Sequence, residues 1–242
     1  MNRLVVTMGD PCGVGPEIIV KFFDGIYKVE DKRLFLVVVG SKSVLEYYKK
    51  KLRIDLEIVE ITKAHIVDGK LENGKLHLIN IDTDINSLEF GKHTELGGAL
   101  SIKYLDKAIE LCHGKYVDGI VTCPISKDSI NMAGFKYSGH TEYLAEKTKT
   151  EDFAMVLKGK KVVVLLNSTH VSLKEAINRV TKESVLNKIR LAQKAKQELG
   201  LTGSIAVAGL NPHNGENGLF GTEEIEIIAP AVEEAKKEGI DC

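Results

Sequence analysis

Residues 3–23, with the sequence RLVVTMGDPCGVGPEIIVKFF, place one apolar run before a glycine-rich turn and a second apolar run after it. The first run predicts a buried strand. Gly13 and Gly15 allow the chain to turn tightly, and Pro16 suits the first turn of a helix. The stretch therefore predicts a strand, a turn and a helix in immediate succession.

The same succession recurs along the chain. Strands are expected within 33–40, 55–61, 75–81, 117–125 and 204–213, with a hairpin or two adjacent strands within 153–170. Helices are expected within 41–52, 96–114, 140–148, 172–180, 182–200 and 222–239. The strand runs are nearly continuous Val, Ile and Leu, which is typical of parallel sheets covered on both faces. The sequence therefore predicts the α/β class.

Composition narrows the range of functions. The chain has 242 residues, 43% of them hydrophobic, and a net charge of -1, which argues against disorder and against a nucleic-acid-binding protein. It lacks an apolar run of the roughly 20 residues that span a bilayer, and the N-terminal sequence lacks the features of a signal peptide. The four cysteines are scattered without a C-x-x-C pair, which argues against a disulfide framework. A cytoplasmic protein is expected.

Polar residues follow several of the predicted strands, where open α/β sheets bind their ligands. The residues selected at these strand ends, with their glycine and proline neighbours, are Gly9, Asp10, Thr122, Pro124, Lys127, Asn167, Thr169, His170, Asn211 and His213. His170 and His213 form the most informative pair, because borderline metals such as zinc or cobalt favour imidazole ligands. The alternative is that each is a hydrogen-bonded structural histidine. A catalytic zinc ion usually has three protein ligands, so a third would have to come from elsewhere or be absent.

A second candidate site lies in SGHTEYLAEKT, residues 138–148, which predicts a helix start that attracts anions. Ser138 or Thr141 would cap this helix, and His140 would add a donor or a charge to a phosphate. The alternative is an ordinary N-cap. Lys127 is interpreted as a solvated lysine, a phosphate ligand or a proton-transfer group. His65, His77, His93 and His113 lie in polar stretches and receive no function.

Five segments, taken together and in order, resemble the 4-hydroxythreonine-4-phosphate dehydrogenase family. They are TMGDPCGVGPEI (7–18), VTCPISKDSINMAG (121–134), SGHTEYLA (138–145), LLNSTHVSLKEAI (165–177) and GLNPHNGENGLFGTEEIEIIAPAVEEA (209–235). The resemblance implies an isocitrate/isopropylmalate dehydrogenase-like fold, with two α/β domains flanking a cleft, in a homodimer. We assign residues 1–125 to the first domain and 126–242 to the second.

The resemblance also implies a reaction. Family enzymes oxidise the secondary alcohol of 4-phosphooxy-L-threonine with NAD or NADP, and loss of carbon dioxide then gives 3-amino-2-oxopropyl phosphate, in pyridoxal phosphate biosynthesis. A divalent ion such as zinc, cobalt or magnesium assists. By this resemblance His170 and His213 bind the metal, and His140 and Thr141 bind substrate. The assignment of Lys127 to proton transfer rests on its position alone.

The sequence departs from the family pattern at its end. Family members continue further, through a third metal histidine, more phosphate-binding residues and a segment near the nicotinamide, so a truncated enzyme is expected. Two alternatives remain open. One is a paralogue acting on threonate or erythronate 4-phosphate, and the other is a catalytically silent remnant that binds a phosphorylated ligand.

Overall fold

The computed structural model describes residues 2–25, 34–69, 71–72 and 74–242. By its internal contacts the chain divides into two compact units, Met1–Lys147 and Thr148–Cys242, here called the N-terminal and C-terminal units. The sequence-based boundary between residues 125 and 126 therefore lies inside the N-terminal unit, and as a statement about the family's domains it stays a prediction.

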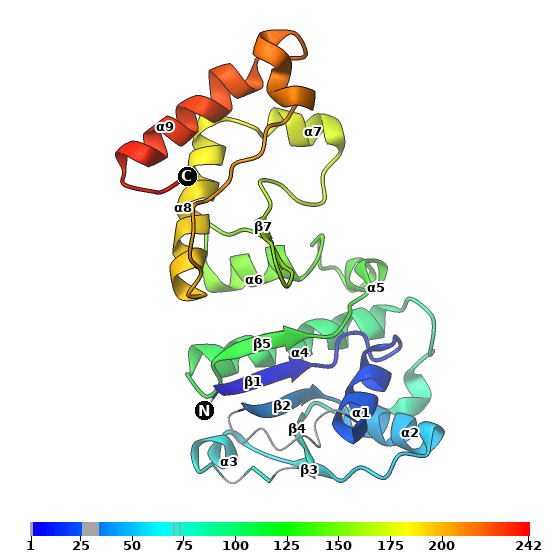
Figure 1. The fold of residues 1–242 in the computed structure, drawn as a ribbon. Helices are drawn as coiled ribbons and strands as arrows, with labels where there is room; N and C mark the ends of the chain where they lie inside the picture. Colours follow the sequence, from blue (N-terminus) through cyan, green and yellow to red (C-terminus); the bar gives the residue numbers. More distant parts are fainter. Residues whose placement is uncertain (1, 26–33, 70, 73) are drawn as a thin grey trace. The chain divides into compact units, whose positions relative to one another are not determined.

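The N-terminal unit is built on a parallel five-stranded sheet with the strand order β3-β4-β2-β1-β5 (Figure 1). Its strands are β1 (Asn2–Thr7), β2 (Leu34–Gly40), β3 (Ile58–Glu60), β4 (Leu76–Asn80) and β5 (Gly119–Thr122). All four pairings are parallel, and Val5 lies opposite Val37 and Ile120. The parallel α/β prediction is confirmed for this unit.

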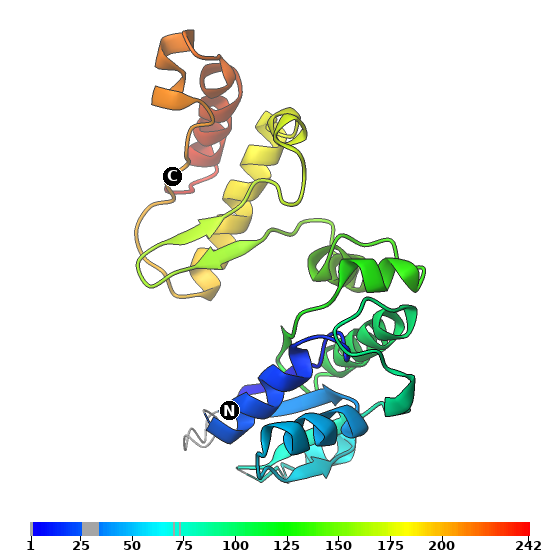
Figure 2. The same cartoon turned by 90° about the vertical axis from the view of Figure 1, so that its right-hand side faces the viewer.

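Helices cover both faces of this sheet (Figure 2). The helices of this unit are α1 (Gly15–Gly25), α2 (Lys42–Leu52), α3 (Lys63–Val67), α4 (Glu95–His113), α5 (Lys127–Met132) and α6 (His140–Thr148), with a 3₁₀ turn at Ile85–Ser87. Of these, α5 packs against α4. Along the strand order, the chain moves in one direction from β1 to β2 and in the opposite direction from β4 to β5. Because parallel crossovers are right-handed, the helices on these two crossovers, α1 and α4, lie on opposite faces of the sheet.

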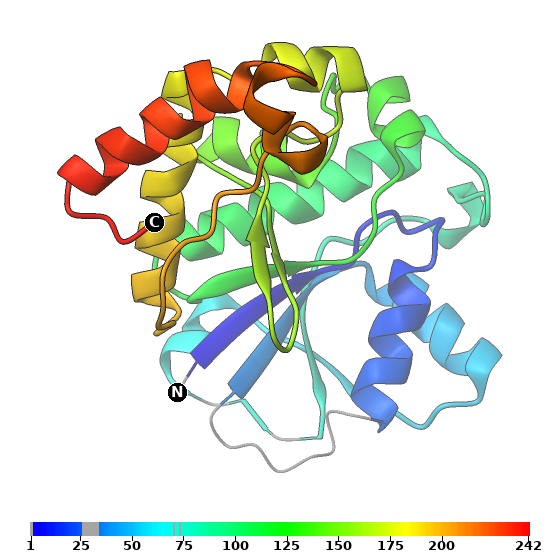
Figure 3. The ribbon, with the colours of Figure 1, turned by 45° about the horizontal axis from the view of Figure 1, so that its top comes forward.

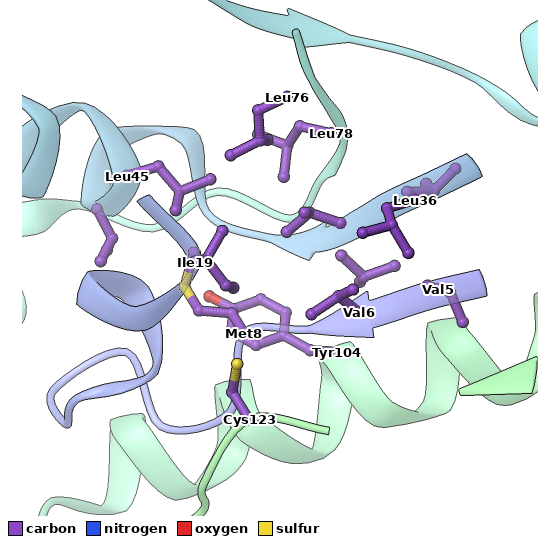
Figure 4. Packing of buried hydrophobic residues seen from close by; sticks show 14 of the residues in the cluster. Val5, Val6, Met8, Ile19, Leu36, Leu45, Leu76, Leu78, Tyr104 and Cys123 are labelled. Carbon is purple, nitrogen blue, oxygen red and sulfur yellow. The ribbon is translucent and has the colours of Figure 1, made fainter. Parts of the chain in front are cut away.

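The runs of Val and Leu in the strands form the hydrophobic core of this unit. Leu36 is 4% exposed, and Val37, Val38 and Val39 are fully buried, so side chains on both faces of β2 are covered. Figure 4 shows Met8, Tyr104 and Cys123 among the buried side chains that pack around β1 and β2. Continuous rather than alternating burial is what a sheet between two helical layers requires.

The C-terminal unit contains a β-hairpin and helices. An antiparallel pair, β6 (Val156–Lys158) and β7 (Val163–Leu165), confirms the expected hairpin (Figure 3). The helices are α7 (Leu173–Asn178), α8 (Lys182–Glu198) and α9 (Ala229–Lys237), preceded by a 3₁₀ segment, η2 (Pro212–Gly218), and a π-helical turn, η3 (Glu224–Ile228). Val185, Leu186 and Ile189 of α8 pack with Ala231 and Ala235 of α9.

The strand predicted at the start of 204–213 is wrong. Residues 204–208 form no strand in the structure, and the amide of Ile205 donates to the carbonyl of Asp241 at 2.9 Å. The apolar pattern of the segment fits a strand, but a strand also needs a neighbour to complete its hydrogen bonds. No other described segment forms the repeated backbone hydrogen bonds of a strand pair with residues 204–208.

Candidate functional site

The glycine-rich turn after β1 is fixed by close backbone packing. Gly9 has a φ of +72°, and a Cβ there would lie 2.2 Å from the carbonyl oxygen of Pro124. A Cβ on Gly15 would lie 2.0 Å from the carbonyl oxygen of Met8. The amide of Asp10 also donates to the Pro124 carbonyl at 3.0 Å. These contacts favour the interpretation of residues 9–17 as a structural turn.

Asp10 connects this turn to helix α5, which begins at Lys127. Its carboxylate is buried and accepts hydrogen bonds from the Cys12 amide at 2.9 Å and the Ser129 hydroxyl at 3.0 Å. Ser129 lies in α5, whose N-cap is Ser126. A buried carboxylate is tolerated where hydrogen bonds replace its water. Asp10 therefore fixes the start of α5 against the end of β1.

Lys127 is the first residue of α5, and its side chain is exposed. Beside it, the Ser126 hydroxyl lies 2.7 Å from Nδ1 of His93, and Nε2 of His93 lies 3.9 Å from a carboxylate oxygen of Asp128. Sequence reasoning gave His93 no function, and its position next to Lys127 depends on two loops that are 33 residues apart. The described residues provide no ion pair for the Lys127 amine.

His140 is the first residue of α6, and Thr141 follows it in the first turn. The Nε2 atom of His140 is buried without a hydrogen-bond partner in the described chain, and burial lowers the pKa of its imidazole. Neither Ser138 nor Thr141 makes a side-chain hydrogen bond within the described residues, so the expected cap is not observed. A buried, unpartnered imidazole nitrogen is a feature that a ligand can complete.

His170 and His213 both lie in the C-terminal unit, and both are exposed. His170 follows β7 with a φ of 55°, and His213 follows residues 204–208 with a φ of 51°. Left-handed backbone is uncommon for residues other than glycine. Such conformations persist only where the surrounding structure holds them in place, and they are enriched at functional sites.

The loop around His213 contains an unusual run of left-handed residues. His213, Asn214, Gly215, Glu216 and Asn217 all have positive φ angles, between 45° and 78°. A side chain at Gly209 would collide with Asn214, since its Cβ would lie 2.0 Å from Oδ1 of that residue. The loop therefore turns tightly and presents the His213 imidazole to the exterior, with the Phe220 ring 6.3 Å away.

Glu224 holds this loop, and sequence reasoning missed it. The buried carboxylate accepts hydrogen bonds from the amides of Leu210 at 2.7 Å and Asn211 at 2.6 Å, and from the Asn211 side chain at 2.9 Å. These bonds lower the pKa of Glu224 to about 2. The signal available in the sequence was the acidic pair in GTEE, close behind the histidine loop.

A catalytic metal ion would need more ligands than His170 and His213 provide. Two exposed imidazoles are suitable ligands for a divalent ion. However, the described residues contain no group of three or more His, Cys, Asp or Glu side chains placed to hold one. A catalytic zinc site usually needs three protein ligands. The described chain therefore offers two metal donors and not a complete site.

The family profile described as "Pyridoxal phosphate biosynthetic protein PdxA" matches residues 32–242. The chain is 42% identical over 241 residues to a "Putative D-threonate 4-phosphate dehydrogenase" of Fusobacterium nucleatum, covering 99% of this chain and 71% of that protein. It is 39% identical over 244 residues to a 4-hydroxythreonine-4-phosphate dehydrogenase of Sulfurihydrogenibium sp., covering 100% of this chain and 73% of that protein.

Solved structures of enzymes with the same name also match this chain. The crystal structure of 4-hydroxythreonine-4-phosphate dehydrogenase from Klebsiella pneumoniae matches with a TM-score of 0.88 and 34% identity, over 99% of this chain and 72% of that one. This match confirms the isocitrate/isopropylmalate dehydrogenase-like fold. No helix in the described parts of the chain is long and apolar enough to cross a membrane. The chain belongs to the PdxA family of pyridoxal phosphate biosynthesis, whose relatives are named as dehydrogenases.

Proposed function

We propose that this protein is an NAD(P)-dependent dehydrogenase of a four-carbon phosphorylated hydroxy acid, with 4-phosphooxy-L-threonine as its substrate. Family membership supplies the reaction class. The observation that carries the proposal is the strained loop of His213, which hydrogen bonds to Glu224 hold in place. Strained backbone lowers the free energy of unfolding and is found mainly at functional sites. A strained loop that exposes an imidazole and is held by a buried carboxylate is therefore expected where that imidazole binds a ligand. We further propose a cytoplasmic homodimer.

The proposed reaction has two steps. A hydride leaves the carbon that bears the secondary hydroxyl and passes to the nicotinamide, while the hydroxyl proton passes to a base. The resulting β-keto acid then loses carbon dioxide, and the electron pair of the broken bond forms an enolate that takes up a proton to give 3-amino-2-oxopropyl phosphate. Each step moves negative charge onto the same oxygen, so one set of positive or donor groups serves both.

Each proposed site residue has a role consistent with its position. His140, with its buried and unpartnered Nε2, binds the phosphorylated substrate together with Thr141. His170 and His213 are the proposed ligands of a divalent zinc, cobalt or magnesium ion, which when bound would lower the pKa of the substrate hydroxyl. Lys127, exposed at the start of α5, is the proposed proton-transfer group. The cofactor-binding residues are left unassigned.

A second substrate is favoured by a specific observation, because the relative with 42% identity is named for D-threonate 4-phosphate. Threonate carries a hydroxyl where threonine carries an amine. The deciding experiment supplies the purified chain with NAD or NADP and each metal in turn, and compares the two phosphorylated acids by the appearance of reduced nicotinamide.

Turnover of 4-phosphooxy-L-threonine above that of threonate 4-phosphate supports the proposal, and the reverse preference assigns the paralogue. Binding without turnover of either compound indicates the silent remnant. In an active chain, Lys127→Ala should lower turnover without a comparable rise in KM. Unchanged turnover would remove Lys127 from the mechanism.

A further inference from the structure

The Asn167 side chain makes no hydrogen bond to any residue that the structure describes. Asn167 follows β7 in the C-terminal unit and precedes His170 by three positions. Both polar atoms of its carboxamide, Nδ2 and Oδ1, are buried, and neither has a hydrogen-bond partner in the described chain. Four other residues, Tyr104, His140, Glu142 and Gln193, each contribute one such atom, whereas Asn167 contributes two.

Such an arrangement is unfavourable for the isolated protein. Most buried polar side-chain atoms in folded proteins are hydrogen-bonded, and each exception calls for a reason. An apolar side chain of the same shape would fill this position without the cost of burying an unpaired amide. His140, which the family resemblance links to substrate, shows the same feature. An unpartnered polar atom therefore already coincides with one proposed ligand contact in this chain.

We propose that Asn167 is a substrate-contact residue, whose carboxamide hydrogen-bonds both a donor and an acceptor on the phosphorylated hydroxy acid. This inference rests on the proposed function. A phosphate or a carboxylate alone would satisfy Nδ2 and leave Oδ1 unpaired, because neither group donates when ionised. The matching ligand chemistry is an acid group next to a hydroxyl or an amine, which both candidate substrates contain.

The position of Asn167 supports this assignment. Asn167 lies two residues beyond the end of β7, in the turn that leaves the antiparallel hairpin. The same short turn carries His170 with its left-handed backbone. A single turn thus carries a buried, unpaired carboxamide and an exposed imidazole three residues apart.

The test uses Asn167→Leu in the full chain, with Asn187→Leu as the matched control. Asn187 lies in α8 of the same unit, and its side chain donates to Asp152. The melting temperature of each protein is measured alone, with 4-phosphooxy-L-threonine and with D-threonate 4-phosphate. Without ligand, Asn167→Leu should melt at or above the wild-type temperature, because an apolar isostere removes two unpaired polar atoms.

With ligand, Asn167→Leu should bind the preferred compound about ten-fold or more weakly, as expected when a ligand's hydrogen-bond partners are removed. Asn187→Leu should keep the wild-type affinity. A ligand-free Asn167→Leu that melts well below wild type, or that binds with wild-type affinity, would overturn the inference. If the wild type binds neither compound, the proposed function fails first, and this inference fails with it.

Discussion

Replacing Glu224 with alanine tests how the His213 loop is held. The change removes three hydrogen bonds, two from the backbone amides of Leu210 and Asn211 and one from the Asn211 side chain. The loop beyond them contains four left-handed residues other than glycine, His213, Asn214, Glu216 and Asn217. Each such residue costs about 1 kcal/mol relative to right-handed backbone. The strained conformation therefore depends on support from outside the loop, and the Glu224 carboxylate supplies it.

The assay is amide hydrogen exchange followed by NMR. In the wild type the Leu210 and Asn211 amides are protected by their bonds to the Glu224 carboxylate, so in Glu224→Ala they should exchange about ten- to a hundred-fold faster. Glu224→Gln should show a smaller effect, because its amide oxygen can still accept the two backbone bonds. Glu226→Ala is the matched control, since Glu226 lies exposed in the same π-helical turn.

Unchanged exchange in Glu224→Ala, or an equal change in Glu226→Ala, would refute the reasoning.

The protection of the Leu210 and Asn211 amides should also depend on pH. The folded pKa of Glu224 is about 2 and the unfolded value is near 4.5. A depressed carboxyl pKa stabilises the folded form above the unfolded pKa, and this contribution is lost as the pH falls toward the folded pKa. The loop should stay protected from about pH 5 upward and lose protection in acid.

Three further predictions concern the N-terminal unit. Tyr104→Phe should raise the free energy of unfolding by about 1 kcal/mol and the melting temperature by about 2–4 °C, because Tyr104 is fully buried and its hydroxyl has no partner in the described chain; a lower melting temperature would contradict this. The expectation that His77 lies in a polar stretch is wrong, because His77 is buried in β4. Its Nε2 accepts the Glu72 amide at 3.1 Å, and burial lowers its pKa. Its contribution should therefore be complete above the unfolded pKa of about 6.5 and be lost below it, so urea unfolding of His77→Asn should depend less on pH across that range. Gly15→Ala should lower the free energy of unfolding by about 1–3 kcal/mol, because its Cβ would meet the Met8 carbonyl. Gly25→Ala, at the open end of the same helix, should leave the free energy of unfolding undiminished, and calorimetry of both variants measures the difference.

Much of the fold follows from local sequence. The strands of the N-terminal unit are recognisable because their apolar runs satisfy a sheet covered on both faces. Helix starts are equally local, because the capping side chain accepts a hydrogen bond from the backbone amide three residues ahead. This holds for Ser41, Thr94, Ser126, Ser172 and Thr181. The candidates after β1 and β5 could also be selected in advance, because parallel strands bring their carboxyl ends to one edge. His170 and His213 do not follow such strands, since β7 is antiparallel and residues 204–208 form no strand.

Other features depend on contacts between distant residues, and the sequence alone did not reveal them. The apolar pattern of residues 204–208 fits a strand, but pairing depends on a neighbouring strand that the pattern does not specify. The same limit applies to Glu224, which acts on residues 13 and 14 positions earlier, and to Asp10, whose partner Ser129 is 119 positions away. The unpaired amide of Asn167 is visible only once burial is known. The sequence by itself determined most of the elements and the reactive residue types, because both depend largely on local composition and spacing. Only the tertiary structure decided which groups are buried, braced or left without a partner, because those properties arise from packing between segments far apart in the chain.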